Sequence, residues 1–536
     1  MDYQLTVPAI MRRAATMYAN VAVVSCTGEG AIHRYHYGDM LRRARQLAVA
    51  LQRLGVRGGD RVGTMAWNHH QHLEAYFAVP AIGAVLHTLN LRLHANDLAY
   101  IIEHGGDRVI IVDSSLVPLL SRIRLPHSLE HIVVMGEGEL PPDAIEYEAL
   151  VAGADPERFE EARPEEDEAA AMCYTSGTTG RPKGVVYSHR AIALQAMVLT
   201  TADSIGIRRR DVVLAVVPMF HINGWCLPFA AALAGATLVL PGARLEPDAL
   251  LRLVASERVT VSAGVPTVWL GVLHALDRAA GAHDVSTLRT LVIGGSAVPK
   301  ALLRGYQERY GIKVMQAWGM TETTSIATVC TTPPELDDST QEAQYAWRVK
   351  QGTAMPFVEI RARTNYGLAP WDGETMGELE VRGPAVATAY YNEPSASDRF
   401  TDDHWFRTGD VVTISPGGCI ELRDRSKDLI RSGGEWISSV ALENALMGHP
   451  AVAEAAVVAV PHPKWDERPL AVVVLKPGQQ ATEEELRAHI APDFAKWWLP
   501  DRMEFIDEIP RTSTGKFLKS ALRERFRMRY AQTLER

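Results

Sequence analysis

The apolar and polar positions of roughly the first 160 residues follow two alternating periods. In YGDMLRRARQLAVALQRLGV, residues 37–56, apolar side chains recur at helical spacing, and a glycine pair follows at Gly58 and Gly59. The short apolar runs DRVGTMAW (60–67) and DRVIIVD (107–113) indicate buried strands. Strands that alternate with helices favour βαβ units, so this region predicts an α/β fold.

The same alternation returns between residues 172 and 351. Strand-like runs occur at 211–218, 260–266, 290–295 and 313–318, and KALLRGYQERY (300–310) has a helical pattern. No fixed-period similarity relates the two regions, so we expect two doubly wound halves, about 1–165 and 166–350, without a sequence repeat. The acidic stretch 155–170 between them is typical of a solvated connector.

From residue 352 the pattern changes to short strands separated by glycine and proline, as in MGELEVRGPAV (376–386). This pattern predicts a small β-rich, barrel-like subdomain over 351–424. The C-terminal region has α+β character, with one helix opened by the capping-box pair Thr482 and Glu485. We therefore expect a large body, residues 1–424, and a small C-terminal domain, residues 429–536.

Composition and charge exclude several classes of protein. The net charge is −9 and the basic residues form no stripe, which argues against nucleic acid as a partner. The five cysteines form no CxxC pair, so we expect neither a disulfide framework nor a zinc site, and a cytoplasmic location fits. The apolar stretch 214–240 is interrupted by prolines and polar residues, so we expect no integral membrane segment.

One loop concentrates the residues that bind phosphate. YTSGTTGRPKG, from Tyr174 to Gly184, holds four serine and threonine hydroxyls, three glycines and two cations. Glycine lets backbone N–H groups approach anionic oxygen closely. The loop contains no GxxxxGK[ST], so it is not a Walker A loop. Taken alone, it could also be a plain turn.

Five further motifs follow this loop in order: GGSAVP (294–299), QAWGMTETT (316–324), WFRTGD (405–410), DRSKDLIRSGGEWISS (424–439) and PRTSTGKFLK (510–519). Together the six motifs resemble the superfamily of adenylate-forming enzymes, which contains acyl-CoA synthetases, luciferases and the adenylation domains of peptide synthetases. The resemblance runs nearly end to end. PMFHINGWCLP (218–228) and HPKWDERPLAVVV (462–474) are similar to bacterial medium- and long-chain fatty acyl-CoA synthetases.

The resemblance implies a ligase that works in two steps. A carboxylate attacks the α-phosphorus of ATP to give an acyl-adenylate and pyrophosphate, and the thiol of coenzyme A then displaces AMP. Both steps bring anions together, so positioning and charge stabilisation should dominate catalysis. The resemblance also implies a hinge at residues 425–428, centred on Lys427, that lets the C-terminal domain move between the steps.

The nucleotide site follows from the same motifs. The resemblance assigns the β- and γ-phosphates to the loop and to Lys183, and Mg²⁺ to Glu322 and Thr175. A single carboxylate is sufficient for Mg²⁺ when phosphate oxygens complete its coordination. Asp410 and Arg425 would hold the ribose, although Arg425 could instead pair with the neighbouring Asp424. The remaining nucleotide-binding residues implied are Thr175, Ser176, Gly177, Thr178, Thr179, Gly180, Gly294, Gly295, Ser296, Gln316, Trp318, Gly319, Thr321 and Lys516.

The resemblance assigns catalysis to Lys516, Thr175, Lys183 and His221. Lys516 would reach from the C-terminal domain to the carboxylate and the α-phosphate. Many relatives have tyrosine where this chain has Trp318, and either ring could stack on adenine.

The acyl and CoA passage would include His221, Trp225, Gly433 and Gly434. His221 and Trp225 could also be ordinary core residues. AGVPTVWLGVL (263–273) carries no acidic residue for an amino-acid ammonium group, which disfavours an amino-acid substrate. The resemblance implies a medium- to long-chain fatty acid. The alternatives are a ligase for 3-methylthiopropionate or for a short-chain or aryl acid, an enzyme that acylates a carrier protein, and an inactive adenylate-binding regulator. A homodimer is expected by resemblance.

Overall fold

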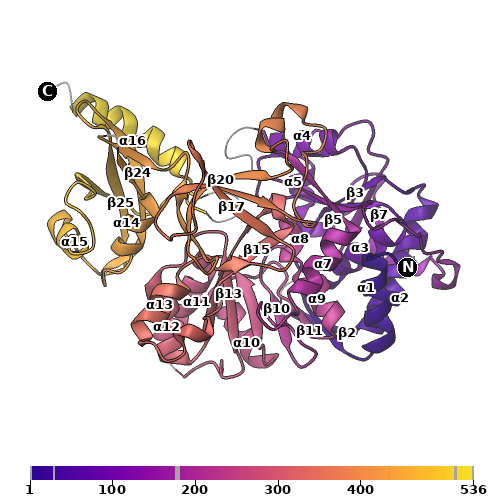
Figure 1. Ribbon diagram of the computed structural model, residues 1–536. Helices are drawn as coiled ribbons and strands as arrows, with labels where there is room; N and C mark the ends of the chain where they lie inside the picture. The colour runs from indigo at the N-terminus through magenta and orange to yellow at the C-terminus, as the bar shows by residue number, and fades with distance from the viewer. Residues whose placement is uncertain are drawn as a thin grey trace.

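The computed structural model describes residues 3–27, 30–175, 181–279, 281–433, 435–511 and 516–533. Two large sheets organise the body (Figure 1). The seven-stranded sheet has the order β7-β6-β5-β3-β4-β8-β9, with β9 antiparallel to β8 and the other pairings parallel. Its strands are β3 (Arg61–Met65), β4 (Val85–Thr88), β5 (Asp107–Asp113), β6 (His131–Met135), β7 (Ile145–Glu146), β8 (Ala169–Tyr174) and β9 (Gly184–Ser188).

The nine-stranded sheet has the order β16-β15-β14-β13-β12-β10-β11-β1-β2 and is parallel from β14 to β1. The edge strands β2, β15 and β16 pair antiparallel. Its strands are β1 (Ala22–Thr27), β2 (Ala31–His36), β10 (Val212–Ala215), β11 (Thr237–Leu240), β12 (Val261–Gly264), β13 (Thr290–Gly294), β14 (Lys313–Met320), β15 (Ser325–Val329) and β16 (Thr353–Ala354). Buried parallel strands require continuous apolar runs, which this sequence supplies.

Helices cover both faces of each large sheet. One apolar core joins α1 (Val7–Met17), α2 (Tyr37–Arg53), α3 (His70–Ala81), α7 (His189–Val198) and α9 (Leu227–Ala234) with one face of each sheet. The opposite face of the nine-stranded sheet carries α10 (Pro247–Ser256), α11 (Pro266–Arg278), α12 (Lys300–Tyr310) and α13 (Gln341–Arg348). The opposite face of the seven-stranded sheet carries α4 (Ala95–Gly105) and α5 (Val117–Leu120). The short helices α6 (Tyr147–Ala152) and α8 (Ile222–Trp225) complete the body.

The chain does not divide between the two large sheets at residue 165, where we placed the boundary. Strands β1 and β2, from residues 22–36, lie in the nine-stranded sheet, and β8 and β9, from residues 169–188, complete the seven-stranded sheet. The periodicity of a segment predicts that it forms a strand but carries no information on its hydrogen-bonding neighbour. The two halves therefore interleave along the sequence.

Two smaller units follow the body. An antiparallel sheet, β18-β17-β19-β20-β21, is built from β17 (Glu359–Thr364), β18 (Gly367–Leu368), β19 (Gly377–Arg382), β20 (Phe406–Ile414) and β21 (Ile420–Arg425). The C-terminal sheet, β23-β22-β25-β24, contains β22 (Ile430–Ser432), β23 (Glu435–Ile437), β24 (Val452–His462) and β25 (Asp466–Leu475), with β26 (Arg502–Phe505) parallel to β25. α14 (Ser439–Leu446) and α15 (Glu483–Ile490) share a core with one of its faces, and α16 (Lys519–Thr533) packs on the other.

The C-terminal unit stands at one end of the molecule, next to the small sheet and far from the N-terminus (Figure 1). The expected α/β body with a small α+β C-terminal domain is confirmed. The capping box at the start of α15 is also present, since Thr482 N donates to Glu485 Oε2 at 2.8 Å. Within the described residues, no helix combines the length and apolar character needed to cross a bilayer.

Candidate active site

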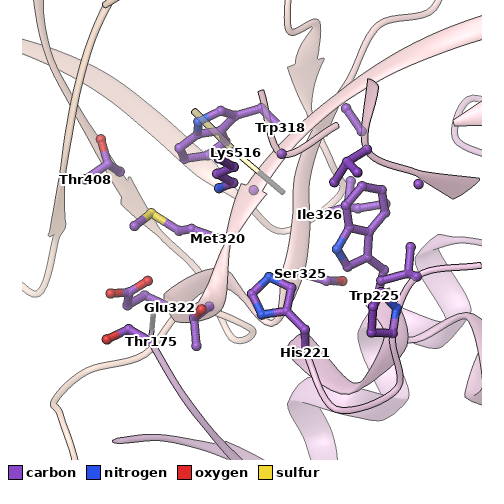
Figure 2. A pocket seen from close by; sticks show the side chains of 18 of the residues that line it. Thr175, His221, Trp225, Trp318, Met320, Glu322, Ser325, Ile326, Thr408 and Lys516 are labelled. Atoms are coloured by element: carbon purple, nitrogen blue, oxygen red, sulfur yellow. The ribbon is translucent and has the colours of Figure 1, made fainter. Parts of the chain in front are cut away.

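A cavity of about 380 Å³ lies where the large sheets, the small sheet and the C-terminal domain meet. Its wall includes residues at or just beyond the carboxyl ends of β8, β10, β12 and β13, which is where open α/β sheets bind ligands. Figure 2 shows Thr175 and Glu322 on one side of it, Trp318 and Lys516 on another, and His221 and Trp225 on a third. A neighbouring cavity of about 220 Å³ shares Gly295, Trp318 and Lys516 with the first.

The ends of the glycine loop are held together by two hydrogen bonds. Thr175 N donates to Lys183 O at 2.9 Å, and Lys183 N donates to Thr175 Oγ1 at 3.1 Å. Both residues line the first cavity. The loop residues Ser176, Gly177, Thr178, Thr179 and Gly180 lie outside the described residues.

Glu322 lies in a short 3₁₀ turn, Thr321–Thr323, and is 5% exposed. Tyr390 Oη donates to its Oε1 at 2.6 Å, and Lys183 Nζ lies 5.0 Å from the centroid of the Tyr390 ring. Tyr187 Oη donates to the backbone oxygen of Thr321 at 2.9 Å, which holds the turn against β9. The structure thus brings the loop lysine to the ring, and the predicted metal ligand to the hydroxyl, of one tyrosine.

The predicted ribose residues lie on adjacent strands of the small sheet, and Trp318, predicted for adenine, reaches them from β14 of the nine-stranded sheet. Asp410 on β20 is paired in register with Arg425 on β21, and Arg425 Nε lies 3.0 Å from Asp410 Oδ1. Trp318 Nε1 donates to Asp410 Oδ2 at 2.8 Å. The guanidinium of Arg425 thus pairs with Asp410. Asp424, the alternative partner weighed above, accepts the backbone N–H of Arg425 at 2.8 Å.

Two glycines in this region are required by close packing. A Cβ on Gly319 would lie 1.7 Å from Ser325 O, and a Cβ on Gly294 would lie 2.5 Å from Ala317 O. Gly295 and Ser296 follow at the end of β13 and line the second cavity, as does Gln316. The Gln316 Oε1 atom is buried without a hydrogen-bond partner. Buried polar atoms usually have a hydrogen-bond partner, so a ligand in the second cavity could donate a hydrogen bond to this oxygen.

The half-buried Lys516 lines both cavities. A Cβ on Gly295 would lie 3.6 Å from Lys516 Cε, so the side chain runs beside the end of β13. Burial lowers the pKa of Lys516 to about 8, and the charge of Arg425 adds to this effect while Asp410 and Glu322 oppose it. Lys427 lines the same cavities, and burial lowers its pKa as well.

His221 and Trp225 lie on the apolar side of the first cavity (Figure 2). Burial lowers the pKa of His221 to about 3, helped by the charges of Lys516 and Arg92, so the imidazole is neutral near pH 7. Trp225 is 7% exposed. Its φ is positive at 53°, and φ is also positive at Asn223 (40°) and Cys226 (57°). A Cβ on Gly294 would lie 3.3 Å from the Trp225 ring.

The wall on this side contains apolar residues from two segments, including Val216, Phe220, Val265 and Val268. No charged side chain reaches the first cavity from the described residues of 216–225 or from 263–273.

Gly433 lines neither cavity. Its N–H donates to Trp465 O at 2.8 Å, and a Cβ there would lie 2.9 Å from the Trp465 ring. Gly434 lies outside the described residues. Of the residues predicted for the acyl and CoA passage, the structure therefore brings His221 and Trp225, but not Gly433, to the cavity that holds Lys516.

Sequence reasoning missed Tyr390, Arg399 and Arg92, which also line the first cavity. Burial lowers the pKa of Arg92. Arg92 follows β4 closely, and its place after the carboxyl end of a parallel strand was a usable signal. No comparable pattern marks Tyr390 or Arg399, which come from the irregular segment before β20.

Comparisons with known proteins give a consistent result. A model of the AMP-binding enzyme family matches residues 11–391, and a model of the AMP-binding enzyme C-terminal domain matches residues 441–516. A long-chain-fatty-acid–CoA ligase of Thermus thermophilus is 48% identical over 99% of this chain and 97% of its own length. A 3-methylmercaptopropionyl-CoA ligase of Ruegeria lacuscaerulensis is 41% identical over 98% of each chain.

Two further proteins extend the comparison. A medium-chain-fatty-acid–CoA ligase of Ectopseudomonas oleovorans is 39% identical over 98% of this chain and 97% of its own length. The crystal structure of an anthranilate CoA ligase in complex with anthranoyl-AMP superposes with a TM-score of 0.87 at 27% identity, covering 99% of both chains.

The fold and the cavity, with these relatives, define an AMP-forming acid–CoA ligase. The chain belongs to the AMP-binding enzyme family, within the superfamily of adenylate-forming enzymes. ATP, a carboxylic acid and coenzyme A are the substrates of ligases of this kind.

Proposed function

We propose that this ligase activates a medium- to long-chain fatty acid, forming acyl-CoA, AMP and pyrophosphate through an acyl-adenylate. The observation that carries the proposal is the apolar wall formed by segments 216–225 and 263–273, which offers an acyl chain apolar surface and no carboxylate for an ammonium group. The fatty acid–CoA ligases at 48% and 39% identity support the same substrate class.

In the first step, the positive charge of Lys516 would stabilise the carboxylate and the α-phosphate as they approach each other. The hydroxyl of Thr175, the ammonium of Lys183 and the intervening loop would bind the β- and γ-phosphates. Thr321 would donate to the α-phosphate. Asp410 and Arg425 would bind the ribose hydroxyls.

The adenine ring would occupy the space between the end of β13 and Trp318, and its amino group would donate to Gln316. The 6-amino group offers the donor that the unpaired Gln316 Oε1 lacks. Gly294, Gly295, Ser296 and Gly319 would allow the ring to approach the backbone.

The chemistry of the donors fits a magnesium ion. Glu322 presents a buried carboxylate in the same cavity as Thr175, and Tyr390 occupies only its Oε1. Mg²⁺ needs few protein ligands when phosphate oxygens and water complete its octahedron. When bound, the ion would neutralise phosphate charge, and Glu322 and Thr175 would hold it.

In the second step, we propose that the C-terminal domain rotates about Lys427, which withdraws Lys516 and brings Gly433 and Gly434 towards the acyl-adenylate. His221 would separate the acyl and thiol routes as a neutral imidazole. Trp225 would border the acyl passage. The boundary between the body (1–424) and the C-terminal domain (429–536), a homodimer and a cytoplasmic location remain predictions.

The test is release of AMP with ATP and Mg²⁺, with and without CoA, on butyrate, octanoate, laurate, palmitate, 3-methylthiopropionate and cinnamate. The proposal predicts CoA-dependent turnover that peaks on octanoate, laurate or palmitate. A peak on butyrate or cinnamate would contradict it, and an adenylate that CoA cannot discharge would indicate a carrier-protein acceptor. If no acid supported release of AMP, an inactive adenylate-binding regulator would be favoured.

A ligase for 3-methylthiopropionate is the second candidate. The relative from Ruegeria at 41% identity supports it. Turnover that peaks on 3-methylthiopropionate and falls at least tenfold on octanoate would select this candidate.

A further inference from the structure

Asp424 lies immediately before the segment that joins the body to the C-terminal domain. It is the penultimate residue of β21, in the small sheet, and is 1% exposed. Its Oδ1 accepts the N–H of Arg425, within the same strand. Its Oδ2 accepts the backbone N–H of Ser439 at 2.6 Å and the hydroxyl of Ser439 at 2.5 Å. Ser439 is the first residue of α14, so these two bonds cross from the body to the C-terminal domain.

A buried lysine orients the serine in this contact. Lys519 Nζ donates to Ser439 Oγ at 2.6 Å and lies 2.7 Å from Glu443 Oε1. Because the ammonium occupies an acceptor site of the hydroxyl, the hydroxyl proton is directed to Asp424. Although burial lowers the pKa of Lys519, the carboxylates of Glu443 and Asp424 raise it above its ordinary value. Lys519, Ser439 and Asp424 therefore form a chain of charge-assisted hydrogen bonds, each strengthening the next.

Lys516 lies close along the sequence to this chain of hydrogen bonds. Lys519 is the first residue of α16 and follows Lys516 by three residues, at most about 10 Å of extended backbone. When Ser439 is bound to Asp424, the anchored Lys519 keeps this segment against the body, with Lys516 beside Gly295. A second bond, from Ser438 Oγ to Arg423 O, crosses the same junction.

We propose that Asp424 and Ser439 form a latch that stabilises the arrangement in which Lys516 reaches the cavity, and that the latch opens for the second step. This inference rests on the proposed rotation about Lys427. That rotation carries Ser438, Ser439 and Lys519 away from Arg423 and Asp424, which stay with β21. Asp424 and Ser439 act through the position of Lys516. Asp424 borders the second cavity, whereas Ser439 lines neither cavity.

The two half-reactions test the latch. Asp424→Asn removes the charge, and Ser439→Ala removes the hydroxyl. We expect each to slow adenylate formation from ATP and acid about tenfold, the typical effect of one hydrogen bond to a charged group. Transfer from supplied octanoyl-adenylate to CoA should stay within twofold of the wild-type rate or become faster, since that step uses the open latch.

Thr482→Ala is the matched control, because it removes a capping bond of α15 inside the C-terminal domain and does not cross the junction. It should leave the ratio between the rate of adenylate formation and the rate of transfer to CoA unchanged. The double variant Asp424→Asn/Ser439→Ala should be no slower in adenylate formation than the slower single variant, since both changes break one contact. The latch would be overturned if the rate losses of the two single variants multiplied in the double variant. It would also be overturned if the single variants slowed both half-reactions equally.

A readout without substrate separates this inference from the proposed function. Trypsin should cleave the junction at Arg425 or Lys427 several times faster in both latch variants than in the wild type or in Thr482→Ala. Equal cleavage rates would overturn the latch whatever the acid proves to be. If Asp424→Asn does not fold, Ser439→Ala decides the question. If the wild type prefers another acid, the half-reactions are measured with that acid, so failure of the fatty acid proposal leaves the latch open to its own test.

Discussion

The two ends of the first cavity are built in different ways. At the proposed nucleotide end, charged side chains are held by specific partners. Tyr390 binds Glu322 in the first cavity, and Asp410, which lines the adjoining second cavity, pairs with Arg425 and Trp318. At the proposed acyl end, beside His221, the wall is apolar and needs only shape. Electrostatic stabilisation of developing charge depends on fixed geometry, whereas an apolar pocket discriminates weakly between neighbouring chain lengths. We therefore expect the nucleotide end to determine the rate of adenylate formation with any acid. We expect the acyl end to determine which acid is preferred.

The strongest test of the nucleotide end is Lys516→Ala. Loss of the only C-terminal ammonium assigned to the reacting groups should slow adenylate formation about 10³-fold for every acid, the upper range for removal of one charge-stabilising donor. Single-turnover quench with ATP and each acid measures this rate. Transfer from supplied acyl-adenylate to CoA should persist, and the exposed-lysine variant Lys496→Ala should match the wild type. A loss of rate that differs among the acids would contradict the division of roles between the two ends of the site.

Glu322→Gln should act next most strongly. Replacing the carboxylate by an amide should weaken Mg²⁺ binding and slow adenylate formation about 10²-fold at limiting Mg²⁺. A titration of the rate with Mg²⁺ measures the shift in half-saturation. Glu335→Gln, at an exposed position, is the control. An unaltered Mg²⁺ response in Glu322→Gln would remove this residue as the ligand.

The pH dependence should report Lys516. Its pKa is lowered to about 8, so the charged form is lost as pH rises through that value. The kcat/KM for ATP in adenylate formation should therefore fall about tenfold per pH unit above about pH 8.

Two variants check this assignment. Lys516→Arg should be slower but keep a flat profile, because arginine stays charged. His221, with a pKa of about 3, is already neutral, so His221→Gln should retain the falling limb. A wild-type profile that stays flat to about pH 10 would contradict the assignment.

Trp225→Ala should have the smallest effect and should act on selectivity alone. Removing the indole from the apolar wall should change the ratio of kcat/KM between palmitate and octanoate about fivefold, within the range of one or two methylene contacts. Competition between the two acids measures the ratio directly. Trp371→Ala, at an exposed position of the small-sheet unit, should leave it unchanged. An identical acid profile in Trp225→Ala would assign this residue to core packing.

The sequence was sufficient for the local structure and for the identity of most candidate residues. The runs at 211–218 and 290–295 contain β10 and β13, and Thr482 and Glu485 form the expected cap. These features depend on side-chain periodicity and on neighbours within one turn of chain, which the sequence contains directly. The motifs also marked Glu322, Asp410 and Lys516, which the structure brings to two neighbouring cavities that share Lys516.

Only the tertiary structure decided which distant segments meet. It placed β1 and β2 in the second large sheet, paired Arg425 with Asp410, and added Tyr390 and Arg92 to the site. It also decided that Lys516 lies in the cavity while Gly433 lies outside it, and that Asp424 binds Ser439 across the junction. These contacts depend on burial and on bonds between residues far apart in sequence, whose free energies arise only once the chain has folded.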